Sequence, residues 1–158
     1  MKTVLILLSC TVFIVFALFF ILGIMSKQGQ ALGLVDNALS SCSDKPNCVC
    51  SENKDDLEHY IAPLSLDQIS PNDSLAMLKQ IIIEMGGTLQ SETAYYLAAT
   101  FSSTIFSFID DLEIRIDNKQ RLIHFRSASR VGHSDMGVNN KRIERLKQLV
   151  QKKVGDNN

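Results

Sequence analysis

The sequence has no strong excess of charge of either sign. It contains 16 Lys and Arg residues against 17 Asp and Glu residues, which gives a formal net charge of −1. Lys2 precedes an apolar N-terminal segment, and without it the rest of the chain is slightly acidic. Because nucleic-acid-binding domains present a basic surface to the phosphates, this balance predicts that nucleic acid is not a partner.

The sequence also lacks a recognised catalytic spacing. No Gly-x-Ser-x-Gly turn occurs, although this turn is what exposes the nucleophilic serine in α/β-hydrolases. Residue types suited to a nucleophile–base–acid relay do occur close together, at Ser127, Ser129, His133, Ser134 and Asp135. Since a relay depends on geometry rather than on composition, these residues alone do not predict hydrolysis.

Charged residues are absent from Thr3 to Ser26, and the run from Val4 to Met25 is almost entirely apolar. A membrane-spanning helix needs about 20 such residues, whereas the apolar core of a cleaved signal peptide has about 7–15. Residues 1–27 are therefore predicted to form a single-pass transmembrane anchor or an uncleaved signal. The small residues Gly29-Gln30-Ala31 leave open the alternative of cleavage and secretion.

A second cysteine pair, which a zinc site of two knuckles would require, is also missing. Cys42, Cys48 and Cys50 are close together in the chain, with Pro46-Asn47 between the first two. Pro-Asn favours a tight turn, so we predict a disulfide between Cys42 and Cys48, which implies an oxidising compartment. The alternative is a redox or soft-metal site formed by the three cysteines and His59. We predict neither a metal site nor a cofactor.

The region after the anchor divides by composition. Residues 28–41 contain glycines and small polar residues with few apolar ones, and are predicted to be a linker. A folded domain is expected over 42–154, followed by a disordered tail over 155–158. A short edge strand is expected at 60–64, because Pro63 has no amide hydrogen to donate to a neighbouring strand.

Two helices are predicted in the domain. Ser70-Pro71-Asn72-Asp73 supplies an N-cap, a first-turn proline and an acid, and Gly86-Gly87 supplies the end of the first helix. The second helix is predicted to start from an N-cap at Asn139 or Asn140, and its basic polar side leaves lipid binding as an alternative to docking on the sheet. The apolar stripes are Leu75, Leu78, Ile81, Ile82 and Met85 in the first helix, and Ile143, Leu146, Leu149 and Val150 in the second.

Three strands are predicted, at 94–101, 106–117 and 121–127, with a turn at 118–120 between the last two. Consecutive strands joined by short turns pair in antiparallel fashion. We therefore expect an α+β domain in which an antiparallel sheet carries two helices on one face, preceded by one N-terminal transmembrane helix.

Asp110 is out of place in the second of these strands. Because side chains alternate between the two faces of a strand, Asp110 shares a face with Leu112 and Ile114. An unpaired buried carboxylate costs several kcal/mol, so Asp110 needs a cation or several hydrogen-bond donors beside it. Arg126, Arg130 and the backbone amides of the following loop are the expected suppliers. Asp110 would then act as a latch that pins the loop.

Two alternatives remain for Asp110. It could act as a general base or metal ligand, with His133 and Asp135 as its partners. A β-bulge at Asp110-Asp111 would instead turn the carboxylate to the surface.

The richest set of polar residues lies in the loop 126–142, after the last predicted strand. Loops at the end of a rigid scaffold are where binding residues concentrate. Gly132 and Gly137 would let the backbone curl so that its amides face an anion. The predicted binding residues are Asp110, Arg126, Ser127, Ser129, Arg130, Asp135, Asn139, Lys141 and Arg142.

Five motifs spread over the region from Cys42 to Val150 resemble those of one known family. They are Cys42-x-x-x-Pro46-Asn47-Cys48-Val49, Phe108-Ile109-Asp110-Asp111-Leu112-Glu113, Arg126 to Gly132, Ser134 to Asn139 and Lys141 to Glu144. The family that they resemble is the uncharacterised domain-of-unknown-function family 1499, and the resemblance implies an exported or envelope protein of bacteria, with plastid relatives, and no established activity.

Three residues depart from those typical of the family: Cys50 replaces a serine, His133 an aromatic and Asn140 an arginine. A redox or histidine mechanism would therefore not be shared with these relatives.

These features predict a single-pass protein of the bacterial inner membrane with its C-terminal domain in the periplasm. We expect an exported envelope domain that binds a small anionic ligand or another envelope protein through the loop 126–142, and that contacts the membrane through its N-terminal helix. The rival is an enzyme that uses Asp110, His133 and Asp135 for acid–base or metal-assisted hydrolysis. A third alternative is a structural assembly factor of the envelope.

Overall fold

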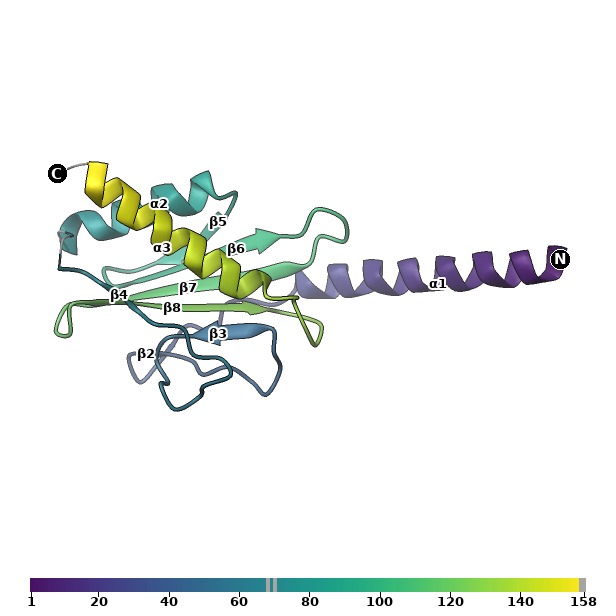
Figure 1. The fold of residues 1–158 in the computed structure, drawn as a ribbon, viewed down its shortest axis with the longest axis horizontal. Coiled ribbons are helices and arrows are strands. Elements are labelled where there is room, and N and C mark those ends of the chain that lie inside the picture. Colours follow the sequence, from purple (N-terminus) through teal and green to yellow (C-terminus); the bar gives the residue numbers. More distant parts are fainter. Residues whose placement is uncertain (68, 70, 157–158) are drawn as a thin grey trace.

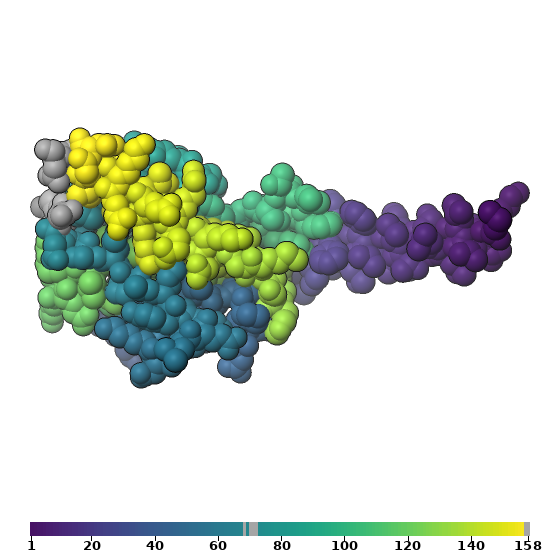
Figure 2. Space-filling model, viewed as in Figure 1, coloured from purple at the N-terminus to yellow at the C-terminus, as the bar shows by residue number. Residues whose placement is uncertain are grey.

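In the computed structural model, which describes residues 1–67, 69 and 71–156, one long helix leads into a domain built on a sheet (Figure 1). The long helix, α1 (Lys2–Ser26), is apolar enough to cross a membrane and projects from one end of the domain (Figure 2). The domain contains two further helices, α2 (Pro71–Glu84) and α3 (Val138–Asp156). The expected α+β class with an N-terminal apolar helix is confirmed.

The strands pair in antiparallel fashion throughout the named ladders. They are β1 (Leu34–Val35), β2 (Ala38–Leu39), β3 (Cys48–Cys50), β4 (Leu64–Ser65), β5 (Thr88–Glu92), β6 (Tyr96–Ser102), β7 (Ile109–Asp117) and β8 (Leu122–Ser129). Within the described residues, β1 and β2 form a separate hairpin, and the main sheet of six strands has the order β3-β8-β7-β6-β5, with β4 also paired to β8.

The central hairpin of β7 and β8 carries most of the residues discussed below. The two strands are joined by the turn predicted at 118–120. Their register is continuous and pairs Asp110 with Ser129 and Asp111 with Ala128. A bulge at Asp110-Asp111 is therefore excluded.

Helices α2 and α3 cover one face of the sheet and close the main core (Figure 1). Leu112, Ile114 and Ile116 alternate along β7 into this core, and Phe125 of β8 is fully buried beside them. Each large apolar side chain that is fully buried contributes about 1.5–3 kcal/mol. Since the stripe of α3 is buried here, this helix docks on the sheet, and lipid is not what its apolar side contacts. The buried stripe residues are Leu78, Ile81 and Ile82 of α2 and Ile143, Leu146 and Val150 of α3.

The opposite face of the sheet is covered by the segment that follows α1. Gly33 donates its amide to Glu113 Oε1 at 2.8 Å. Leu39 is 3 % exposed and clusters with Tyr96 of β6. The segment 28–41, expected to be a linker, thus contains the β1-β2 hairpin and a buried side chain. It is ordered on the sheet because the buried acids of β7 need hydrogen-bond donors, and this segment supplies one.

The limits of the predicted strands differ from those observed. β6 and β8 lie close to the predicted 94–101 and 121–127, whereas β7 begins only at Ile109. The prediction of a strand from residue 106 is wrong because Phe106 and Phe108 pack against α1 instead of joining the sheet.

Other short strands were not predicted, and one was misplaced. β3 and β5 have too little apolar alternation to be recognised from the sequence. The strand expected at 60–64 is wrong: Tyr60 makes a single bridge to Cys50, and the ladder begins at Leu64.

The ends of two helices also differ from the expectation. The predicted N-cap Ser70 lies outside the described residues. α2 ends before Gly86, whose φ of 86° fits the predicted glycine terminator. α3 continues to Asp156, so the tail expected to be disordered from residue 155 is helical as far as the structure describes it.

Candidate functional site

The loop between β8 and α3 is shaped by Asp135 and two glycines. Gly132 and Gly137 have φ of 90° and 76°, which residues with a Cβ rarely adopt. The Asp135 carboxylate accepts hydrogen bonds from the amides of Gly137 (2.9 Å) and Asn139 (2.7 Å) and so caps α3. The prediction of Asn139 or Asn140 as the N-cap is wrong. Two amides of the anion site expected in this loop are already bonded to a carboxylate of the chain.

Asn139 ties the start of α3 to the ends of two strands. Its side chain is buried, with Oδ1 accepting from Ser127 Oγ at 2.6 Å. Its Nδ2 donates to the backbone oxygen of Asn47 at 3.0 Å and to Ser129 Oγ at 3.2 Å. Arg142 donates to both Ser127 Oγ, at 2.9 Å, and Asn139 Oδ1. A buried polar network satisfied in this way fixes the geometry of the loop.

Asp110 is paired with Arg142 of α3. Arg142 Nη2 donates to Asp110 Oδ2 at 2.6 Å, and the guanidinium carbon lies 4.6 Å from the centroid of the Phe101 ring. Arg126 and Arg130, the expected partners of Asp110, are engaged on the other face of the sheet. The expectation was wrong because α3 packs on the face of the sheet where Asp110 lies, and Arg142 of α3 supplies the cation there.

On the other face of β7, two acids pair with two arginines. Glu113 is fully buried and accepts from Arg126 Nη1 at 2.9 Å and from the Tyr96 hydroxyl at 2.8 Å. Burial, together with the nearby Glu113 carboxylate, holds the pKa of Tyr96 well above its usual value, so its phenol remains a donor. Arg130 donates two parallel hydrogen bonds to the Asp111 carboxylate, at 2.7 and 2.8 Å.

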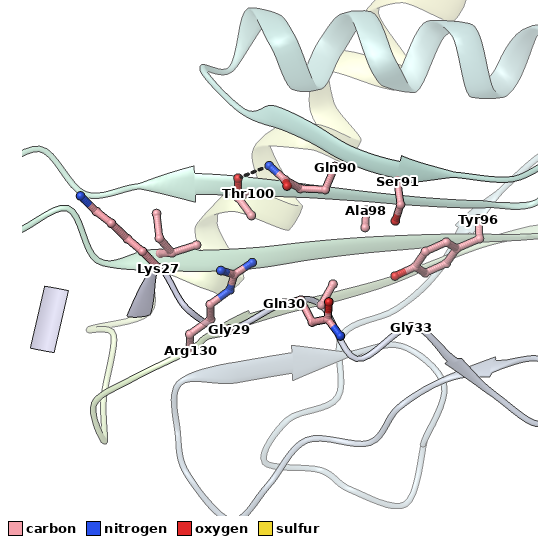
Figure 3. Close-up of a pocket in the computed structure, with 12 residues that line it drawn as sticks. Lys27, Gly29, Gln30, Gly33, Gln90, Ser91, Tyr96, Ala98, Thr100 and Arg130 are labelled. Atoms are coloured by element: carbon pink, nitrogen blue, oxygen red, sulfur yellow. Dashed lines mark hydrogen bonds between the residues drawn. The ribbon is translucent and has the colours of Figure 1, made fainter. Parts of the chain in front are cut away.

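A groove of about 550 Å³ opens on this face, between the segment after α1 and strands β5 and β6 (Figure 3). Lys27 and Arg130 lie at one end, Tyr96 at the other, and Gln30 between them (Figure 3). Among the described residues that line the groove there are two cations and no carboxylate. The lining is therefore suited to a polar ligand with an anionic group.

Arg130 keeps part of its hydrogen-bonding capacity. A guanidinium has five N–H groups. Two bonds to Asp111 and one to the backbone oxygen of Ser26 occupy three of them. Lys27, by contrast, makes no ion pair within the described part of the chain. The groove thus offers one free ammonium and a guanidinium held in a fixed position.

A smaller hollow of about 310 Å³ lies where α1 meets the loop. It brings together the three candidates for catalysis, and its polar lining is Ser103, Asp110, Ser129, His133, Ser134 and Asp135. Both carboxylates of this lining are already engaged, Asp110 by Arg142 and Asp135 by the amides of Gly137 and Asn139. His133 is exposed and takes part in none of the hydrogen bonds or ion pairs between described residues. The hollow therefore contains the residue types of an acid–base site, but His133 makes no hydrogen bond to Asp110 or Asp135.

The predicted binding residues are thus divided among several places. Arg130 lines the groove, whereas Asp110, Ser129 and Asp135 line the hollow. Lys141 is exposed on α3 and borders neither. The side chains of the remaining four make hydrogen bonds inside the fold: Arg126, Ser127, Asn139 and Arg142.

Lys27 and Gln30 were not predicted as site residues. They lie in a segment that the composition marked as a linker. One signal was available, because Lys27 is the first charged residue after the apolar run and so is fixed near the start of the domain.

The cysteines form the expected bridge. Cys42 and Cys48 are disulfide-bonded, with their Cα atoms 5.7 Å apart. Cys50 is a buried free thiol, and burial raises its pKa, so it stays protonated and a poor nucleophile at neutral pH. His59 bonds to Asp56 and to the backbone oxygen of Lys45. No cluster of three metal-ligating side chains occurs in the described part of the chain.

Comparison with known proteins gives a family but no activity. No curated protein matches the chain. The model of a family described as a protein of unknown function, DUF1499, matches residues 38–150. The match begins at β2, within the segment that the composition marked as a linker, and it includes every strand of the main sheet. Because this match covers more than two thirds of the sequence, the chain belongs to the DUF1499 family of proteins of unknown function.

Proposed function

We propose that the chain is an exported, membrane-tethered binding domain that holds a small anionic ligand in the groove beside Lys27 and Arg130. The observation that carries this proposal is the charge of the lining, which has two cations and no carboxylate among the described residues. A concave site also favours a small ligand over a protein partner, since protein interfaces are broad and flatter.

The tether and the compartment are part of the proposal. α1 has 25 residues, and about 20 are enough to cross the hydrocarbon core of a membrane. The Cys42–Cys48 bridge needs an oxidising environment, which supports a domain in the periplasm of a bacterium. Lys27 then lies at the membrane surface, and the groove opens directly above it.

The polar loop has a supporting role in this proposal. Asp110, Arg142 and Asn139 hold the end of β8 against α3, and Arg130 follows that end directly. The loop network would fix the backbone from which Arg130 reaches the groove. A rigid support of this kind reduces the cost of ordering a side chain when a ligand binds.

A titration of the full chain tests the proposal. Inorganic pyrophosphate is added to the chain in uncharged detergent micelles, and the heat of binding is measured. We expect binding that weakens about tenfold in Lys27→Gln, because a hydrogen bond to a charged group is worth about 1.5 kcal/mol or more. Lys152→Gln, which removes an exposed lysine of α3, is the matched control and should bind as the wild type does. Absence of binding, or equal weakening in both variants, would contradict the proposal.

One observation favours a second candidate function. The hollow between α1 and the loop is lined by Asp110, His133 and Asp135, so acid–base hydrolysis there is the alternative. The full chain should then hydrolyse p-nitrophenyl acetate, and His133→Ala should abolish this activity without changing pyrophosphate binding. A wild-type chain that leaves the ester intact argues for the binding function alone.

A further inference from the structure

We infer that the tip of the β6-β7 hairpin, residues 103–108, enters the membrane beside α1 and forms a second contact with the lipid. This hairpin tip lies next to α1 at the end of the domain from which the helix projects (Figure 2). The inference rests on the proposed tether, because the tip can reach lipid only if α1 spans the membrane.

The hairpin tip packs on α1 through aromatic rings. The Phe106 ring centroid lies 5.1 Å from that of Phe19, 5.9 Å from that of Phe16 and 6.5 Å from that of Phe20. Gly23 of α1 faces the backbone oxygen of Phe106, and a Cβ at Gly23 would collide with that oxygen. The absence of a side chain at Gly23 is therefore what lets the tip lie directly on the helix.

The contact lies inside the apolar part of α1. The helix rises about 1.5 Å per residue, and the hydrocarbon core is about 30 Å thick. With the apolar run from Val4 to Met25 centred in that core, Phe19 lies about 8 Å below its surface. Lys27 then stays in the headgroup region, where a lysine is stable. The Phe106 ring, which stacks on Phe19, reaches this depth, whereas the Phe106 backbone lies against Gly23 and so stays closer to the membrane surface.

The composition of the hairpin tip fits this position. No charged residue occurs from Thr93 to Ile109. Ile105 is 74 % exposed at the tip, although a large aliphatic side chain in water is unfavourable and in lipid is favourable. The hairpin tip itself therefore carries an exposed apolar side chain and no charge that would oppose its insertion.

Some backbone amides of the tip are hydrogen-bonded within the protein, which favours insertion because unbonded polar groups are costly in lipid. Ser103 accepts from the Ser107 amide at 3.2 Å and, through its Oγ, from the Phe108 amide at 2.9 Å. Ile109 donates its amide to Ser26 Oγ at 3.1 Å. The amides of residues 104–106 lie outside these bonds, which limits the tip to the water-accessible boundary of the core. Shallow insertion satisfies both the exposed apolar side chains and these amides.

Tryptophan fluorescence tests the inference directly, because the chain contains no Trp. Three single-Trp variants of the full chain are reconstituted in phosphatidylcholine vesicles. Ile105→Trp reports the tip, and Leu18→Trp reports a lipid-facing position of α1 at nearly the same depth. Leu57→Trp replaces an 85 % exposed leucine in the segment between β3 and β4. Figure 1 shows the loop after β3 on the side of the sheet opposite α3 and away from α1. Quenching is measured with lipids brominated near the headgroup end of the acyl chain.

We expect Ile105→Trp to emit at shorter wavelength than Leu57→Trp and to lose about half of its emission to the brominated lipid, as Leu18→Trp does, because both lie in the hydrocarbon core. Leu57→Trp should be unaffected. Quenching of Leu18→Trp without quenching of Ile105→Trp would overturn the inference and leave the tether in place. A blue-shifted but unquenched Ile105→Trp would show that the tip contacts protein rather than lipid, and would also overturn it. If none of the three is quenched, the tether of the proposed function fails as well.

Discussion

Arg142 of α3 and Asp110 of β7 face each other at 2.6 Å, with the Arg142 guanidinium also over the ring of Phe101. The two side chains are 9 % and 14 % exposed, so the pair is largely shielded from water. Through this contact the N-terminal part of α3 is held against the end of β7 nearest α1. Together with the hydrogen bonds of Asn139, this pair fixes the position of α3 on the sheet.

Asp110→Asn is expected to destabilise the domain. Removing one partner of a buried ion pair leaves the other charge unpaired in a poorly solvated place, which costs about 3–5 kcal/mol when burial is complete. Because this pair is slightly exposed, we expect a loss of about 2 kcal/mol in the free energy of unfolding. Guanidinium titration of the full chain in detergent measures it.

The control for Asp110→Asn is Glu144→Gln, which removes the exposed pair between Glu144 and Lys147. Exposed pairs contribute about 0–1 kcal/mol, so this variant should unfold almost as the wild type does. An Asp110→Asn chain with wild-type stability would show that Asp110 is not a latch.

Glu113→Gln is expected to be more damaging. Glu113 is fully buried and accepts bonds from Arg126, Tyr96 and the Gly33 amide. An uncharged amide leaves the guanidinium of Arg126 without its counter-charge, at a cost of about 3 kcal/mol or more. The same denaturant titration measures the change, and Glu84→Gln, which breaks an exposed pair with Lys153, is its comparison. Equal stabilities of the two variants would contradict the assignment of Glu113 to the structural interior.

Asp110 shows which features of the fold could be predicted from the sequence and which could not. The two-residue alternation correctly placed Leu112 and Ile114 in the core and marked Asp110 as a carboxylate in need of a partner. It could not name Arg142 as that partner, because the direction in which α3 returns over the sheet is a tertiary property. Local spacing cannot choose between cations from different elements.

The burial of the opposite face of β7 was not predicted from the sequence. A strand with Asp111 and Glu113 on one side is typical of a sheet with a solvated face, yet both acids are buried here. The cover comes from a segment of low hydropathy that packs through hydrogen bonds, and apolar periodicity does not detect such packing. The groove and Lys27 were missed for the same reason, since both depend on that segment lying along the sheet.

The disulfide is expected to contribute about 2 kcal/mol, because it closes a loop with a sequence separation of 6 and shorter loops restrict the unfolded chain less. Unfolding of the full chain is measured with and without dithiothreitol. In Cys50→Ser the reductant should have the same effect as in the wild type, since Cys50 is not part of the bridge. Insensitivity of the wild type to the reductant would count against the bridge.

Two histidines are expected to give opposite pH dependence. Burial lowers the pKa of His124 despite the attraction of Glu52, so the unfolded chain takes up a proton at this residue first as the pH falls below about 6.5. Stability contributed by His124 is thus present above that pH and is lost on acidification. For His59, burial opposes the charge, but the Asp56 hydrogen bonds prevail and raise its pKa. Its contribution is present below about pH 6.5 and is lost as the pH rises through the raised value.

Melting temperatures at about pH 7.5 and pH 5.5 separate the two. Relative to the wild type, His124→Gln should reduce the loss of stability on acidification, whereas His59→Gln should increase it. His133→Gln removes an exposed imidazole and serves as the reference. Shifts of the same sign in His124→Gln and His59→Gln would contradict the assignment.

The proposed location of the groove at the membrane surface and the proposed insertion of the hairpin tip both require that α1 spans the membrane with the domain outside. Labelling of intact bacterial cells that express the Leu57→Cys chain tests this most directly, using a maleimide that does not cross the inner membrane. Leu57 is 85 % exposed, whereas the free thiols Cys10 and Cys50 lie in α1 and in the buried interior. We predict that Leu57→Cys is labelled without permeabilisation and remains in the membrane fraction at full length, while the wild type is not labelled. Labelling that appears only after the cells are permeabilised would place the domain on the cytoplasmic side and contradict the account.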